Sequence, residues 1–334
     1  MSKNPKVALA GCGNFGKKIL DALYKCKLGV VYVCDSDINQ QYFSGIREPS
    51  LFTTDYNSIL NSKDVDIVFI ATPAQTHFEL AKKALLVGKH VFLEKPLTLN
   101  LKDAEALRNL KSYELNDLYL HVDNTFCYSK EVNFLKQIID LNYLGRPIHF
   151  QSVRANWGPF LTNIDVVFDL LPHDLSILEY LFPTMAIGEV IATGEKIKNA
   201  GIIDEAYVHF GRIMDYNGNC MTANICVSWH KPTKIREIII TFENGTVYTN
   251  TASDDFLFQI ADSDNKIIKV FQQSEITELA SPLEVEIKHF INCIKNQKST
   301  LSNLALTVNQ IEIMEKVVES INTGRKMIIC DNPF

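Results

Sequence analysis

The feature that most constrains this chain is a glycine-rich turn between a strand pattern and a helix pattern near its start. The apolar run "KVALA" at 6–10 precedes "GCGNFG", after which apolar residues recur at helical spacing. Glycines in this G-x-G-x-x-G order permit a tight turn, close approach of the backbone to a pyrophosphate, and close helix packing. The helix N-terminus adds its positive dipole end. The turn therefore predicts a dinucleotide site on a parallel sheet.

The strand and helix alternation continues over about the first 120 residues. Apolar runs at 30–35, 66–72, 90–95 and 118–122 predict strands, and amphipathic segments between them predict helices. This βαβ rhythm is typical of a doubly wound parallel sheet. We therefore expect a Rossmann dinucleotide-binding domain over residues 1–122.

The second half of the chain has a different pattern. From about residue 148, apolar strands follow one another across short polar turns such as "DYNGNC" and "ENGT", which favours antiparallel pairing. Two helical patterns close the chain, the first starting with a capping box at Ser281. The expected fold class is α/β. An N-terminal Rossmann domain precedes an α+β domain for substrate binding and oligomerisation, residues 123–334, with a large, mainly antiparallel, open-faced sheet.

Composition narrows the classes of partner. The 334 residues, 46% hydrophobic and 22% charged, predict two globular domains. The net charge of −6, with lysines and arginines spread along the chain, argues against a nucleic-acid partner. Apolar runs fall short of the roughly 20 residues of a membrane span, and no signal-peptide pattern opens the chain, so we expect a cytoplasmic protein without membrane contact. The eight cysteines form no C-x-x-C pair, which predicts buried thiols and no metal site.

An aspartate after the second predicted strand indicates the cofactor. Asp35 lies 19 residues beyond Gly16, where a carboxylate accepts hydrogen bonds from the two ribose hydroxyls of an adenosine. The same charge would repel a 2′-phosphate. The predicted cofactor is therefore NAD rather than NADP.

Two further groups of charged residues stand out. In "LEKPL", Glu94 and Lys95 end a buried strand pattern, where a charged pair cannot fill a core. A surface ion pair remains the alternative. In "FDLLPHDLS", Asp169 and His173 stand four residues apart, the spacing of one helical face. Pro172 between them would kink or start that helix.

Three segments together resemble the glucose-fructose oxidoreductase / inositol dehydrogenase / MocA (Gfo/Idh/MocA) family over nearly the whole chain: "AGCGNFGKK", "IATPAQTHFELAKKALLVGKHVFLEKPL" and "DLLPHDLSILEYL". The resemblance implies that Glu94 holds the nicotinamide ribose, that Lys95 contacts the reacting hydroxyl, and that the bond to Pro96 is often cis. Asp169 and His173 complete the implied catalytic group. His173 would accept the proton, because the ordinary histidine pKa of about 6.5 suits reversible transfer. Asp169 would orient it, and Lys95 would stabilise the developing alkoxide.

The glycine turn and the resemblance together predict two sets of binding residues. The cofactor set is Gly11, Gly13, Asn14, Phe15, Gly16, Asp35, Thr72, Pro73, His77, Glu94, Lys95 and Asn124. His77 equally suits a helix cap, and relatives often have histidine where Asn124 stands. The substrate set is Tyr128, Arg154, Asn156, Trp157, Asp169 and His173. Arg154 would bind a phosphate or carboxylate and Trp157 would stack. A further group suits either contact with an anionic substrate or a solvated sheet rim: Trp229, His230, Lys231, Lys234 and Arg236.

Three segments resemble the nucleotide-sugar branch of the family most, at residues 152–160, 165–181 and 227–240. That resemblance implies NAD-dependent oxidation of UDP-N-acetylglucosamine at carbon 3, ahead of an aminotransferase, in the supply of amino sugars for lipid A or surface polysaccharide. Alternatives are the corresponding uronic acid, inositol or a free sugar, and a non-catalytic NAD-binding regulator. The resemblance also implies a homodimer or homotetramer formed through the open sheet face, for which the apolar alternation of the strand patterns is suited.

Overall fold

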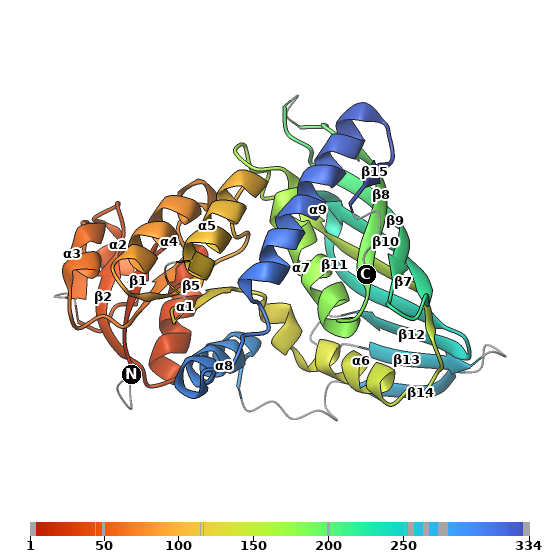
Figure 1. Cartoon of the computed structure of the whole chain (residues 1–334), viewed down its shortest axis with the longest axis horizontal. Helices are drawn as coiled ribbons and strands as arrows, with labels where there is room; N and C mark the ends of the chain where they lie inside the picture. Colours follow the sequence, from red (N-terminus) through yellow and green to blue (C-terminus); the bar gives the residue numbers. More distant parts are fainter. Residues whose placement is uncertain are drawn as a thin grey trace. The chain divides into compact units, whose positions relative to one another are not determined.

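The structure is a computed structural model that describes residues 5–43, 45–48, 51–113, 115, 117–198, 201–250, 252, 257–262, 267–272 and 280–329. The chain forms two units, each with its own sheet (Figure 1). The first unit consists of Met1–Tyr128 and Ala280–Ile311, and the second of Ser129–Leu279 and Glu312–Phe334.

The first unit is built on a six-stranded parallel sheet. Its strands are parallel because each connection between them is a crossover that brings the chain back to the end of the sheet where the previous strand began. The strand order is β3-β2-β1-β4-β5-β6. This is the doubly wound order, in which β2 and β3 are added on one side of β1 and β4, β5 and β6 on its other side. The strands are β1 Lys6–Ala10, β2 Gly29–Cys34, β3 Phe52–Thr53, β4 Ile67–Ile70, β5 His90–Leu93 and β6 Leu120–Val122. The predicted Rossmann sheet is confirmed.

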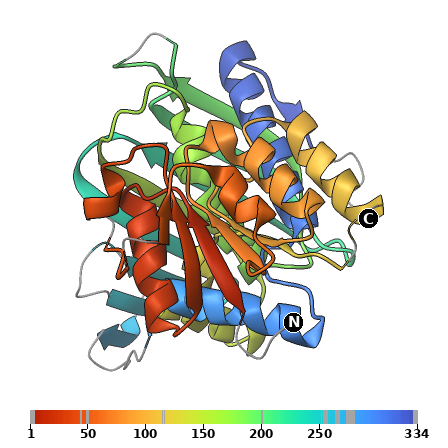
Figure 2. The same cartoon turned by 90° about the vertical axis from the view of Figure 1, so that its left-hand side faces the viewer.

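Helices cover both faces of this sheet, and Figure 2 shows α4 and α5 on the side opposite α1. Their bounds are α1 Asn14–Lys25, α2 Gln40–Phe43, α3 Tyr56–Asn61, η2 Ala74–Thr76, α4 His77–Leu86, α5 Leu101–Tyr113, η3 Thr125–Tyr128 and α8 Pro282–Asn296. Helix α9, Leu304–Thr323, begins in this unit and ends in the second. The capping box predicted for α8 is present, since Ser281 Oγ accepts from the Glu284 N–H at 3.3 Å.

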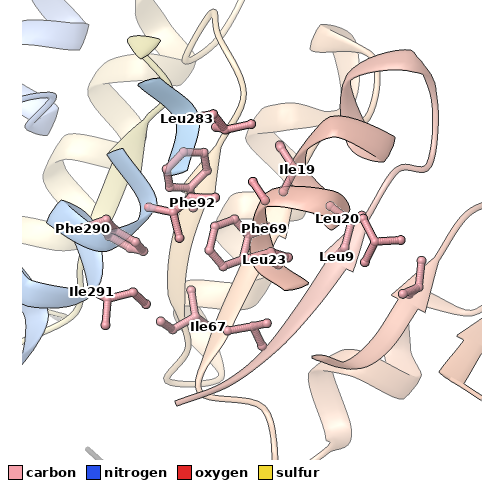
Figure 3. Packing of buried hydrophobic residues seen from close by; sticks show 14 of the residues in the cluster. Leu9, Ile19, Leu20, Leu23, Ile67, Phe69, Phe92, Leu283, Phe290 and Ile291 are labelled. Carbon is pink, nitrogen blue, oxygen red and sulfur yellow. The ribbon is translucent and has the colours of Figure 1, made fainter. Parts of the chain in front are cut away.

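Helix α8 packs on the core of the first unit, although it follows the second sheet in sequence (Figure 3). Phe290 lies against Phe92 of β5, with ring centroids 5.7 Å apart, and Phe92 stacks on Phe69 of β4 at 4.9 Å. All three rings are fully buried, and each such side chain contributes about 1.5–3 kcal/mol of hydrophobic stabilisation. The sequence predicts this helix as part of the second domain, residues 123–334. Its apolar stripe, including Ile287, instead covers the Rossmann sheet.

The second unit contains a nine-stranded sheet in the order β14-β13-β12-β11-β7-β10-β9-β8-β15. Its strands are β7 Pro147–Trp157, β8 Ala186–Glu195, β9 Glu205–Met214, β10 Cys220–Ser228, β11 His230–Phe242, β12 Gly245–Asn250, β13 Leu257–Asp262, β14 Ile267–Gln272 and β15 Met327–Ile328. Neighbouring strands pair antiparallel except β7 and β10, which are parallel. The expected mainly antiparallel sheet is therefore confirmed.

One face of this sheet carries α6, Lys130–Asp140, and α7, Val166–Leu181, together with the end of α9 (Figure 1). The alternation of strand side chains explains this arrangement. In β9, Val208 is buried while its neighbour Tyr207 is 46% exposed on the other face. No helix among the described residues combines the length and apolar character that crossing a bilayer requires.

Candidate active site

The glycine turn between β1 and α1 is as tight as its sequence predicts. Gly11 has a φ of +96°, and a Cβ there would lie 2.5 Å from the carbonyl of Ala71. A Cβ on Gly16 would lie 2.0 Å from the Gly11 oxygen. Only glycine fits at these two positions, because a side chain would displace backbone.

The middle glycine of the turn faces open space. Among the described residues, no atom lies within 4 Å of a Cβ built on Gly13, and no side chain caps the N-terminus of α1. Asn14, the first residue of α1, is exposed, and Phe15 is half-buried. The N–H groups of the first turn of a helix attract anions. This geometry fits a pyrophosphate against Gly13.

Asp35 follows β2 and lies beside the glycine turn. Its Oδ2 accepts from the backbone N–H of Cys12 at 2.6 Å, and its Oδ1 accepts from the Asp37 N–H at 2.9 Å. These two bonds fix a half-buried carboxylate where a ribose would be held. Burial and then the Asp35 charge raise the pKa of the Cys12 thiol to about 12, so this cysteine remains a thiol.

His77 connects two turns at the carboxyl ends of β4 and β5. Its Nδ1 lies 2.8 Å from the Pro96 oxygen and its Nε2 lies 2.9 Å from the Thr72 oxygen. The ring is buried, and burial lowers its pKa. His77 is the first residue of α4, but its ring binds these two turns together. Thr72 Oγ1 contacts Thr76 Oγ1 at 2.6 Å, and Pro73 between the turns is exposed.

Glu94 and Lys95 lie directly beyond β5, at the edge of the sheet where doubly wound folds bind ligands. Glu94 is 9% exposed and its N–H donates to the Ile70 oxygen of β4 at 2.8 Å. Lys95 is half-buried, and its bond to Pro96 is cis. The strand therefore delivers an acid and a base to the same edge as the glycine turn.

The segment after β6 carries the remaining predicted residues of the first unit. Asn124 is 3% exposed, its N–H donates to Glu286 of α8, and its Nδ2 donates to Ser302 Oγ at 3.1 Å. Tyr128 is 8% exposed, with its ring 5.5 Å from that of His289. Burial raises the pKa of Tyr128.

In the second unit, α7 carries both Asp169 and His173. The helix runs through Pro172 without a break, so the two residues share one face as their spacing predicts. Trp229, which is fully buried, donates from Nε1 to Asp169 Oδ2 at 3.1 Å. This bond fixes the Asp169 carboxylate, while His173 is half-buried one turn further along.

Arg154, predicted to bind a phosphate or carboxylate, is held by an acid of its own unit. Its Nε donates to Asp174 Oδ2 at 2.7 Å and its Nη2 to Oδ1 at 3.3 Å, a bidentate pair. The two side chains are 4% and 2% exposed. Arg236 lies beside this pair and donates to Asn156 Oδ1 at 2.8 Å. Burial and then the Arg154 charge lower the pKa of Arg236 to about 10.

Trp157 is the last residue of β7, and its ring belongs to a cluster of aromatic side chains. It is 65% exposed, and its ring meets those of Phe160 and His230 edge to face, with centroids 5.5 and 6.2 Å away. Lys198 Nζ lies 4.9 Å from the Phe160 ring. The exposed face of Trp157 can stack on a ligand ring. Lys231 pairs with Glu205 at 3.0 Å, which reduces its availability to an anion.

A pocket of about 700 Å³ lies on the open face of the second sheet. Its lining includes Gln151, Ile191, Tyr207, Asn224 and Lys231. Neither Asp169 nor His173 belongs to it, so we do not assign it to the chemistry. Its position on a sheet face instead marks an exposed surface that is partly apolar.

Several residues of these sites were missed by the sequence analysis. The sequence suggests Trp229 only as a contact for an anionic substrate, and it does not single out Asp174. Both hold predicted residues through contacts between a strand and a helix, which leave no local pattern. Glu286 could have been noticed, because it is an acid among the inward positions of an amphipathic helix, next to Ile287.

Both halves of the chain match models of one protein family. The model of GFO_IDH_MocA, "Oxidoreductase family, NAD-binding Rossmann fold", matches residues 5–116, and that of its C-terminal alpha/beta domain matches residues 146–329. The scyllo-inositol 2-dehydrogenase (NAD(+)) of Bacillus subtilis is 24% identical over 97% of this chain and 96% of its own. The UDP-N-acetylglucosamine 3-dehydrogenase of Acidithiobacillus ferrooxidans is 33% identical over 34% of this chain and 35% of its own.

Solved structures share the fold across both units. A levoglucosan dehydrogenase in complex with NADH has a TM-score of 0.83 at 18% identity, covering 98% of this chain and 99% of that one. The structure of the Acidithiobacillus ferrooxidans UDP-N-acetylglucosamine 3-dehydrogenase has a TM-score of 0.78 at 20% identity, covering 96% and 98%. Since the family models together match most of its residues, this chain belongs to the Gfo/Idh/MocA family of NAD-binding oxidoreductases.

Proposed function

We propose that this protein oxidises a secondary hydroxyl of a sugar or polyol ring to a ketone, with NAD as oxidant. The observation that carries the proposal is the placement of Lys95 and Glu94 directly beyond β5, at the same sheet edge as the open Gly13 turn and Asp35. A lysine ammonium beside a nicotinamide site suits alcohol oxidation, because it stabilises the alkoxide that develops as the hydroxyl proton and the hydride leave.

Three side chains of this protein have separate roles in the proposed reaction. NAD, when bound, accepts the hydride from the carbinol carbon. A ring nitrogen of His173 takes the hydroxyl proton, and Asp169, fixed by Trp229, orients the acceptor. The Lys95 ammonium stabilises the developing alkoxide. Lys95 belongs to the first unit and the other two to the second, so their joint action rests on family resemblance.

We propose UDP-N-acetylglucosamine, oxidised at carbon 3, as the first candidate substrate. Support comes from the 33% identical stretch shared with a UDP-N-acetylglucosamine 3-dehydrogenase and from the similarity of the two folds. Exposed Trp157 supplies a stacking surface. The corresponding uronic acid is a variant of this candidate.

Free inositol is the second candidate, and two observations favour it. The relative that matches nearly the whole chain is a scyllo-inositol 2-dehydrogenase. Arg154, the cation expected to bind a phosphate, is already neutralised by Asp174. A small uncharged polyol needs no such cation.

The deciding experiment follows NADH formation by absorbance. Purified protein and NAD are incubated with UDP-N-acetylglucosamine, its uronic acid, free N-acetylglucosamine, glucose, scyllo-inositol and myo-inositol. A carbonyl trap or an aminotransferase is present in each reaction, because keto-sugar formation is unfavourable without removal of the product. Turnover confined to UDP sugars supports the first candidate, and turnover of inositols supports the second. Absence of turnover with all of them, with NAD binding intact, would support a regulator and contradict the proposal.

A further inference from the structure

The first unit buries two acids side by side at the end of β6. Asp123 is 3% exposed and Glu286, which reaches it from α8, is fully buried. Glu286 Oε1 accepts from the Asn124 N–H at 2.8 Å and lies 2.9 Å from His121 Nε2. Glu286 Oε2 lies 2.9 Å from Thr125 Oγ1. Both acids therefore contact the short segment that follows β6.

The hydrogen bonds around these acids require an additional proton. Thr125 Oγ1 contacts Asp123 Oδ1 closely and also Glu286 Oε2, but a hydroxyl has one proton and can donate to only one acid. The other acid must donate to the hydroxyl, or two lone pairs face each other. The remaining donors are the N–H groups of Asn124 and Thr125 and His121 Nε2. One carboxyl therefore needs to be protonated.

The surroundings provide no cation to balance two charges. Among the described residues, no lysine or arginine is paired with either acid, and burial lowers the pKa of His121 to about 3, so its ring is neutral. Burial raises the pKa of Glu286 to about 8, and burial with the Glu286 charge raises that of Asp123 well above its usual range. The other titratable groups around the pair, from β5, η3 and α8, are Glu94, Cys127, Tyr128, His289 and Cys293.

We propose that Asp123 and Glu286 share one proton, and that the resulting pair makes Glu286 a positioning residue for Asn124. The backbone of Asn124 is held by Glu286, and its Nδ2 by Ser302. Its Oδ1 is buried and has no hydrogen-bond partner among the described residues, so it can still accept one hydrogen bond. The inference rests on the proposed contact of Asn124 with the cofactor, for which the carboxamide of NAD offers a suitable donor.

The sign of the pH dependence follows from the raised pKa. The folded unit binds the shared proton more tightly than the unfolded chain does, so its stabilising effect is complete below the ordinary glutamate pKa and is lost as the pH rises through about 8. Above that pH two adjacent negative charges repel each other, and the Asn124 segment moves. NAD affinity should therefore fall on the alkaline side.

The test measures NAD dissociation constants by calorimetry between about pH 6 and about pH 9. Wild type should lose about tenfold in affinity over the alkaline part of this range. Glu286→Gln keeps an oxygen for the Asn124 N–H and supplies a donor for Thr125, so its NAD affinity should not fall between neutral and alkaline pH. Glu105→Gln, an exposed acid of the same unit, should titrate like wild type.

Two further measurements separate the proposal from its assumptions. Infrared difference spectra of wild type and Glu286→Gln should reveal a protonated carboxyl at neutral pH, which reports the shared proton without reference to NAD. Asn124→Ala tests the cofactor contact alone, and an unchanged dissociation constant would refute that contact but not the proton. The positioning role is overturned if Glu286→Gln keeps the alkaline loss of affinity, and the shared proton is overturned if both carboxyls are ionised at neutral pH.

Discussion

Breaking the buried pair of Arg154 and Asp174 should destabilise the second unit severely. Asp174→Asn removes the negative charge and leaves a guanidinium that is 4% exposed, with Arg236 beside it. Removing one partner of a buried ion pair costs about 3–5 kcal/mol, because the other charge remains buried without compensation. For a unit of this size, each kcal/mol lowers the Tm by about 2–4 °C, so we expect a fall of about 10 °C.

The double variant Arg154→Met with Asp174→Leu is the matched control. Replacing both charges with apolar side chains of similar volume is often neutral, so its free energy of unfolding should lie within about 2 kcal/mol of wild type. Urea denaturation followed by the fluorescence of buried Trp229 measures both variants.

A different result would show that Arg154 binds the substrate. If Asp174→Asn costs under about 1 kcal/mol while Arg154→Met raises the apparent KM for a nucleotide sugar, the guanidinium faces the substrate and the structural interpretation is refuted. The same variants therefore also help to distinguish a nucleotide sugar from free inositol as the substrate.

Four further predictions concern the cofactor turn and the open sheet. Asp35→Ser should raise the Kd for NAD about tenfold and reduce discrimination against NADP, measured by calorimetry; an unchanged NAD to NADP ratio would argue against the ribose contact. Gly13→Ala should fold normally, because its Cβ meets no described atom, yet bind NAD at least about tenfold more weakly. Gly16→Ala should lose about 3 kcal/mol of stability, since its Cβ would overlap the Gly11 oxygen; equal effects of the two variants on stability would contradict this geometry. Light scattering should give two or four times the 37.8 kDa chain mass, and Tyr207→Glu should yield monomers; a monomeric wild type at micromolar concentration would refute the sheet interface.

The local features of the fold could be predicted from the sequence. The glycine turn, the strand ending at Cys34 and the Ser281 cap each depend on neighbouring residues, so their patterns are visible within a short window. Helix 282–296 shows what a local sequence pattern cannot predict. Its periodicity indicates an apolar face but not which sheet that face covers, and it packs on the first unit rather than the second.

Site partners were harder to predict for a related reason. The motifs identified Asp169 and Arg154, but Trp229 and Asp174, which hold them, come from distant positions brought close by the fold. An arginine in a strand carries the same sequence signal whether it binds a phosphate or an internal carboxylate. Only the structure distinguishes the two, through the burial of the pair and its bidentate geometry.

Lys95, Asp169 and His173 are proposed to act together on a ring hydroxyl beside NAD. The most direct test is the rate of NADH formation in a single turnover at saturating NAD, with the substrate identified by the panel above. Lys95→Met and His173→Asn should each lower this rate by about 10²–10⁴-fold, while the Kd for NAD changes less than about threefold. Full rates in both variants would contradict the account.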